Sequence, residues 1–285
     1  MKLTRRLLWP LAILLLVVTT PLRAAELFYL GEKIPDVQRP WNSTDYQRMI
    51  AALEKIDKTQ ANALPRRSGE FTGPIYLRLV SEENFKPQLN IYAPLELRQN
   101  EAREVLLQLK ELMRLYFDFS AKQQPYGAEA LGLMTYSMRQ QAVLFTLTTE
   151  FWTTLSPNEQ RNPVRLKGLQ EAKDAAAMLT SSALDYLQMS KQFSRDDLVL
   201  YGAELAKQLP DLFVHLPASA RPQLLARIEQ MAANHTYPQV RSSLSELVPV
   251  LSMIQADVDR QQAQPLRQNS TPAIHLDLSP PESAQ

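Results

Sequence analysis

The chain has 285 residues, of which 45% are hydrophobic and 21% are charged, and its formal net charge is +1. It contains no cysteine, which excludes disulfides, thiolate nucleophiles and cysteine-based metal sites, and the near-neutral charge argues against a general attraction to nucleic acid. Only 7 glycines accompany 20 prolines, a balance that disfavours β-sandwiches and glycine-loop nucleotide-binding folds.

The first 25 residues follow the layout of a secretory signal peptide. Basic residues at positions 2, 5 and 6 precede an apolar run over 7–18, and the small residues Ala24 and Ala25 follow. The run is interrupted by Pro10 and is short for a membrane span. The sequence therefore predicts export and cleavage near Ala24 or Ala25, and retention of this segment as a membrane anchor is the alternative.

The working compartment follows from charge and cysteine content. Removal of residues 1–25 takes away four basic residues and no acidic one, so the net charge changes from +1 to −3. An exported chain without cysteine fits a bacterial periplasm better than an oxidising eukaryotic secretory pathway, in which disulfides are common. We therefore expect a periplasmic protein with no stable membrane span, unless the signal segment stays uncleaved.

After the signal segment, we expect residues 26–43 to be irregular, because they include two prolines and few periodic apolar positions. Thr44 then resembles an N-cap, with Gln47 three residues later to complete a capping box. Apolar residues at helical spacing follow. This pattern predicts a helix over 45–62.

The runs 75–80 and 89–92 are rich in residues that favour strands. They predict one small β-hairpin near residues 75–92. A helical turn followed by a loop is the alternative, because Pro74 suits the start of a helix.

The rest of the chain predicts helices, because its apolar residues recur at alternating steps of three and four. Ser156 with Glu159, and later Ser194, have the character of N-caps. Pro210 and Pro249 predict kinks or ends. The expected helices are 95–120, 127–155, 164–192, 195–209, 219–234 and 239–261.

The helix over 127–155 is predicted to be the structural centre. Its apolar residues cover two faces, as is usual for a helix with neighbours on both sides. The main stripe consists of Leu131, Met134, Met138, Phe145 and Trp152.

These elements predict an all-α fold, either a multi-helix bundle or a short array of helical pairs. The expected organisation is a signal peptide over 1–25, an irregular segment over 26–43, a helical domain over 44–261 and a tail over 262–285. The tail is rich in Pro, Gln and Ser and has little to bury, so we expect it to be disordered.

No catalytic, cofactor-binding or metal-binding residue can be assigned. His215, His235 and His275 lie in three separate segments, and no other residues are spaced to complete a metal site. The Gly-x-Ser-x-Gly motif is absent, and Ser120 with Lys122 falls one residue short of Ser-x-x-Lys. We therefore expect no cofactor and no metal.

One stretch resembles a known enzyme signature. Residues 127–134, Gly-Ala-Glu-Ala-Leu-Gly-Leu-Met, are similar to the Gly-Ala-x-Gly-Leu-Met-Gln motif of lytic transglycosylases. These are periplasmic helical enzymes that cleave peptidoglycan with one Glu as acid and base, so the resemblance implies an enzyme that acts on the cell wall.

The chain departs from that signature at three points. One extra residue separates the two parts of the motif, and Thr135 stands where the family has Gln. The upstream Glu-Ser pair is missing, and the nearest carboxylate is Asp118, followed by Phe119. Without that Glu, no residue is placed to give a proton to the leaving group.

Together, these observations favour an exported helical protein of the bacterial envelope that acts by binding a protein or cell-wall partner, without catalysis. The alternative is a degenerate or active enzyme similar to the lytic transglycosylases.

Overall fold

The computed structural model describes residues 27–36, 39–56, 64–123, 126–189 and 192–263. The predicted signal peptide and residues 264–285 of the predicted tail lie outside the described residues. The elements in chain order are β1 (Phe28–Tyr29), β2 (Glu32–Lys33), α2 (Ser43–Leu53), α3 (Gly73–Leu79), the 3-10 helix η1 (Glu82–Phe85), α4 (Lys86–Leu89), α5 (Leu95–Gln123), α6 (Gly127–Thr154), α7 (Pro157–Gln160), α8 (Pro163–Gln188), α9 (Arg195–Phe213), α10 (Arg221–Asn234) and α11 (Pro238–Ala263).

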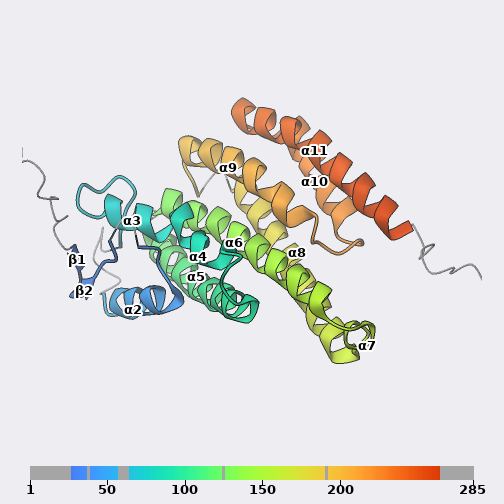
Figure 1. Ribbon diagram of the computed structural model, residues 1–285. Helices are drawn as coiled ribbons and strands as arrows, with labels where there is room; N and C mark the ends of the chain where they lie inside the picture. Colours follow the sequence, from blue (N-terminus) through green and yellow to red (C-terminus); the bar gives the residue numbers. More distant parts are fainter. Residues whose placement is uncertain (1–26, 37–38, 57–63, 124–125, 190–191, 264–285) are drawn as a thin grey trace, which may run out of the picture.

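The prediction of an all-α, multi-helix fold is confirmed (Figure 1). α6 lies in the middle of the molecule and packs against α5 on one side and α9 on the other. α2 covers α5, and α10 and α11 form the opposite edge beyond α9. No helix in the described part of the chain is both long enough and apolar enough to cross a membrane.

The expected hairpin near 75–92 is wrong in its position. That stretch forms α3, η1 and α4, and Pro74 lies in the first turn of α3, where its missing N–H costs nothing. Ile75, Tyr76 and Leu79 face the core from α3, so their apolar character serves a helix. The alternative of a helical turn is therefore correct for residues 75–79. The loop expected after it is partly helical, because η1 and α4 follow.

The small hairpin lies instead within 26–43, where we expected irregular structure. β1 and β2 pair antiparallel, with Phe28 opposite Lys33 and Tyr29 opposite Glu32. Leu30 and Gly31 form the turn with φ values of 52° and 81°, a left-handed geometry that glycine adopts at no steric cost. Two-residue strands carry too little periodicity for the sequence to reveal them.

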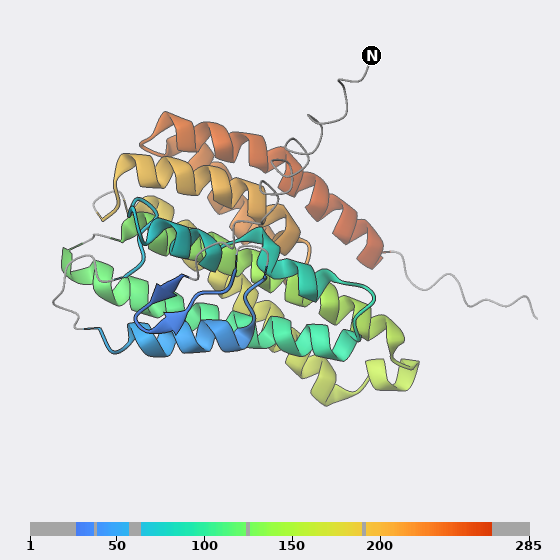
Figure 2. The same cartoon turned by 60° about the vertical axis from the view of Figure 1, so that its left-hand side comes forward.

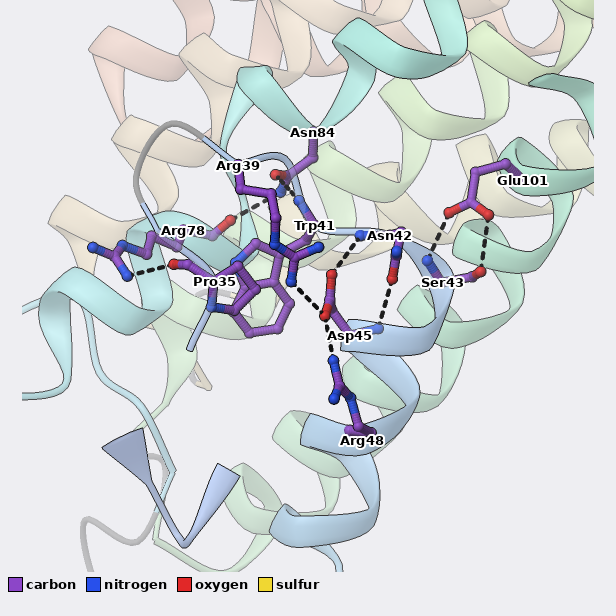
Figure 3. A network of polar contacts seen from close by, with 10 residues as sticks. All are labelled: Pro35, Arg39, Trp41, Asn42, Ser43, Asp45, Arg48, Arg78, Asn84 and Glu101. Carbon is purple, nitrogen blue, oxygen red and sulfur yellow. Dashed lines mark hydrogen bonds and ion pairs between the residues drawn. The ribbon is translucent and has the colours of Figure 1, made fainter. Parts of the chain in front are cut away.

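Polar contacts attach the N-terminal segment to the helices (Figure 3). The Trp41 N–H donates to Asn84 Oδ1 at 2.8 Å, and Asn84 Nδ2 donates to the Tyr46 hydroxyl at 3.0 Å. The Ser43 N–H and hydroxyl both donate to the Glu101 carboxylate of α5, at 2.6 and 2.9 Å. These contacts connect the segment before α2 with α5 and η1, and Trp41 is buried beneath them.

α2 begins with a capping box, but two residues earlier than predicted. Asn42 is the N-cap in place of Thr44, and its side-chain oxygen accepts the Asp45 N–H. The Asp45 carboxylate in turn accepts the Asn42 N–H. Burial by itself raises the pKa of the Asp45 carboxyl, but hydrogen bonds from Arg39, Asn42 and Arg48 outweigh it and lower that pKa below its usual value.

The predicted end of the first helix at residue 62 is wrong, because α2 ends at Leu53 and residues 54–56 form a turn; residues 57–62 lie outside the described residues. α8 likewise ends at Gln188, four residues before its predicted end.

The predicted caps agree better with the structure. Ser156 and Glu159 form the expected capping box at α7, and Ser194 caps α9. Pro210 and Pro249 lie inside α9 and α11 and do not end them. α11 runs to Ala263, so the first two residues assigned to the tail are helical.

Two hydrophobic clusters make up the core, and α6 contributes to both. Leu133, Tyr136 and Leu147 belong to the cluster with α2, α3 and α5. Leu131, Met138 and Phe145 belong to the cluster with α8, α9, α10 and α11. The prediction that this helix is central, with two apolar faces, is confirmed.

Candidate functional site

A groove of about 570 Å³ lies between α5, α6 and α8. Its volume falls in the range of ligand-binding clefts. It is lined by Glu96, Gln99, Asn100 and Arg103 of α5, by Gln141, Leu144, Phe145, Thr148, Phe151 and Trp152 of α6, and by Arg165, Gly168, Leu169 and Ala172 of α8.

Helical spacing explains how each wall is built. The α5 residues fall at steps of three and four, and so do the α8 residues, which places each set on one face of its helix. The α5 wall is polar throughout, whereas the α8 wall is apolar and small beyond Arg165. The α6 residues between them form a floor that is mainly aromatic and aliphatic.

The relative register of the helices follows from two contacts. Gln99 Nε2 donates to the Thr148 hydroxyl at 3.3 Å, so the beginning of α5 lies beside the end of α6. The Arg165 guanidinium lies over the Phe151 ring, 5.8 Å from its centroid, so the beginning of α8 reaches the same end of α6. α5 and α8 therefore both run antiparallel to α6.

The lining of the groove stops at Arg103 of α5 and Ala172 of α8, and the two helices contact each other further along their length. Phe117 of α5 stacks on Tyr186 of α8, with ring centroids 4.8 Å apart and an interplanar angle of 15°. Toward its beginning, α8 has no buried residue before Ala176. In both views α7 lies at an edge of the molecule, with the end of α6 and the beginning of α8 beside it (Figures 1 and 2).

Two arginines face the groove from opposite walls. Arg103 makes no ion pair or hydrogen bond within the described residues. Arg165 forms an ion pair with Glu159 Oε1 at 3.8 Å, which is beyond hydrogen-bond distance, while the other oxygen of that carboxylate caps Ser156. Both guanidiniums can therefore take a carboxylate from a ligand.

Gln141 adds a buried polar group to the floor. Its exposed fraction is only 5%, and within the described residues its side-chain amide has no hydrogen-bond partner. The amide nitrogen and oxygen are not fully enclosed, so they are open to the space of the groove. Gln141 can thus both donate to and accept from a group that enters the groove.

Trp152 corrects the sequence-based prediction. We expected it to be a core residue like Phe145, which is 3% exposed, but Trp152 is only half-buried and lines the groove. The helical pattern identified the right face of α6. At this end of the helix, however, α5 and α8 do not close over that face.

The transglycosylase-like stretch lies at the beginning of α6. Glu129 is 3% exposed, and its carboxylate accepts the Arg67 N–H at 2.6 Å. The backbone oxygen of Glu129 accepts the Tyr76 hydroxyl at 2.9 Å. Glu129 therefore connects the loop before α3 to α6, a contact between residues 62 positions apart that no local pattern predicts.

Asp118, the carboxylate nearest to the position of the family's upstream Glu, lies on α5. It is partly exposed and lies 3.2 Å from Arg114. Neither Asp118 nor Glu129 lines the groove.

The histidines that the structure describes have separate surroundings. His215 stacks on Phe145, and His235 Nε2 lies 2.8 Å from the Leu187 carbonyl. His275 lies outside the described residues. Among the described residues, no group of three or more His, Asp or Glu side chains is arranged to hold a metal.

Comparison with protein-family models, with curated proteins and with solved structures gives no match for this chain.

Proposed function

We propose that this chain is an exported protein of the bacterial envelope that binds a protein or cell-wall partner in the α5–α6–α8 groove, without catalysis. The observation that carries the proposal is the groove itself. It combines a mainly aromatic and aliphatic floor with the Gln141 amide, which has no hydrogen-bond partner among the described residues. Two guanidiniums face it: Arg103 has no ionic partner among those residues, and Arg165 has one long ion pair, 3.8 Å from Glu159. Clefts of this composition bind ligands by apolar contact and use a few polar groups to orient them.

Export rests on the basic, apolar and small-residue layout of the first 25 residues. The test is the intact mass of the protein recovered from the periplasmic fraction. A mass that corresponds to cleavage near Ala24 or Ala25 is expected. A protein that keeps Met1 and stays in the membrane fraction contradicts cleavage and supports an anchor.

Binding in the groove can be tested by site-specific photo-crosslinking in intact cells. A photoreactive amino acid at Asn100, on the α5 wall, should give a discrete adduct. The same amino acid at Lys110, which is exposed on α5 but outside the groove lining, is the matched control.

The decisive variant is Gly168→Leu. A Cβ at Gly168 meets nothing within 4 Å, so the leucine side chain extends into free space at the groove wall and does not disturb the core. It should abolish the Asn100 adduct, whereas Ser182→Leu, at an exposed position further along α8, should not. An adduct that persists in Gly168→Leu excludes the groove as the binding site.

A further inference from the structure

We infer that the groove binds an amphipathic helix of a partner protein, with acidic residues along both edges of its apolar face. This inference rests on the proposed function and specifies its partner. It depends on the arrangement of the three helices, on the small residues of α8 and on the charges of the two walls.

The groove has the geometry of a vacant position in a helix bundle. α5 and α8 run in the same direction over α6, touch at Phe117 and Tyr186, and leave the groove between their beginnings. Its floor extends along α6 from Gln141 to Trp152, which at 1.5 Å per residue is about 16 Å, or roughly three helical turns. A helix that enters such a groove presents anchors at helical spacing to the floor.

The α8 wall permits close approach. Gly168 and Ala172 are one turn apart on the face that lines the groove, and a Cβ at Gly168 meets no atom within 4 Å. Leu169 lies beside them and Leu144 on the floor, so aliphatic side chains of the ligand gain apolar contact. Along the α8 wall itself, hydroxyl groups of a ligand would lose water without gaining hydrogen bonds, so this wall favours an apolar face.

The charges of the walls specify the edges of the bound helix. Arg103 on the α5 wall has no ionic partner within the described residues, and Arg165 on the α8 wall lies 3.8 Å from its nearest carboxylate. A helix with glutamates on both edges of its apolar face pairs with both arginines. Glu96, near the open end of the α5 wall, repels a carboxylate there and so disfavours a uniformly acidic ligand.

The test uses the full-length mature protein and two labelled 16-residue peptides in fluorescence anisotropy. One peptide has a leucine stripe flanked by glutamates, and the other has lysines in place of the glutamates. The glutamate peptide should bind, and the lysine peptide should not. The double variant Arg103→Glu with Arg165→Glu should weaken binding of the glutamate peptide by roughly tenfold or more and should gain binding of the lysine peptide.

The matched control reverses two charges on the same helices outside the groove lining, Lys110→Glu with Lys167→Glu. It should bind the glutamate peptide as the wild type does. If both double variants lose the same affinity for the glutamate peptide, the loss reflects the net charge of the protein and not contacts in the groove. That result would overturn the inference.

Sedimentation with purified peptidoglycan separates this inference from the proposed function. If peptidoglycan retains the wild type but not Gly168→Leu, and neither peptide binds, the occupant is a glycan or its stem peptide. The inference of a helix is then overturned, and groove binding stands. The remaining outcome is that Gly168→Leu changes none of the three readouts: the yield of the Asn100 adduct, peptide binding and retention by peptidoglycan. The proposed function then fails as well.

Discussion

Phe145 and Trp152 lie two turns apart on α6 and have different surroundings. Phe145 is 3% exposed within the second core cluster, whereas Trp152 is half-buried at the groove. Phe145→Ala should lower the free energy of unfolding by about 3–5 kcal/mol. Trp152→Ala should lower it by only about 1–2 kcal/mol, because folding buries less of the apolar surface of Trp152. Urea denaturation of both variants measures the difference, and equal losses would place Trp152 in the core.

Glu129 and Asp118 allow a direct test of the enzyme alternative. We expect no release of muropeptides from purified peptidoglycan by the wild type, and therefore no dependence on either carboxylate. Release that disappears in Glu129→Gln or Asp118→Asn would support a transglycosylase-like activity.

The same two variants should differ in stability. Glu129→Gln weakens a partly buried, charge-assisted bond from the backbone N–H of Arg67, so it should cost about 1–3 kcal/mol. Asp118→Asn removes an exposed ion pair to Arg114, which contributes about 0–1 kcal/mol. Thermal unfolding of both proteins tests the ranking.

His215 should make stability depend on pH. Burial first, and then the charge of Lys173, lower the pKa of the His215 imidazole below its usual value, although Asp211 partly opposes them. Since the folded protein binds this proton less readily than the unfolded chain, the contribution of neutral His215 is complete above about pH 6.5 and is lost as the pH falls through the folded pKa.

The expected result is a fall in melting temperature between pH 7 and pH 5 that is smaller in His215→Gln. The variant also loses the stacking on Phe145, which lowers the melting temperature at every pH, so the slope is the informative quantity. An unchanged slope would assign the pH dependence to other groups.

At the scale of single elements, α8 differs from the other long helices in how little of its first half is covered. Residues 161–168 are all exposed, and the first buried side chain of the helix is Ala176. Because tertiary packing supplies most of the stability of a helix in a protein, intrinsic helix propensity should matter more here than elsewhere.

Gly168→Ala tests this expectation. The new methyl group meets no atom within 4 Å, so the gain in helix propensity should raise the free energy of unfolding by about 0.5–1 kcal/mol. Gly132→Ala in α6 is the contrasting variant, because its Cβ would lie 2.4 Å from the Tyr76 hydroxyl oxygen and displace the bond to the Glu129 carbonyl. It should destabilise the protein, and a stabilising effect would contradict the described packing of α3 on α6.

At the scale of the whole molecule, the shared helix α6 should make the two hydrophobic clusters unfold together. Leu79 belongs to the first cluster and Leu205 to the second, and both are fully buried. Leu79→Ala and Leu205→Ala should each cost about 2–5 kcal/mol and move one common transition to lower temperature.

Far-ultraviolet circular dichroism and differential scanning calorimetry should then give the same midpoint for each variant. A second transition in either variant, with only part of the helical signal lost in the first, would show that the clusters are separate folding units.

Local sequence determined most of the secondary structure. Steps of three and four place the apolar face of each long helix, and the caps at Ser156 and Ser194 use contacts within three residues. The two apolar faces of α6 were therefore predictable, and so was its central position. The strand-like run at 75–80 was misread because burial of Ile75, Tyr76 and Leu79 suits a helix that begins at Pro74 as well as a strand.

Only the tertiary structure decided which apolar faces are covered. Periodicity shows that Trp152 shares a face of α6 with Phe145, but whether a neighbour covers that face depends on how α5 and α8 pack beside α6, where they leave the groove. The hydrogen bond from Arg67 to Glu129 likewise joins residues about 60 positions apart. Arg103 and Arg165, which line opposite walls of the groove, are separated by a similar length of chain. Such pairings leave no periodic signal, because they are set by helix packing and not by the neighbours of each residue along the chain.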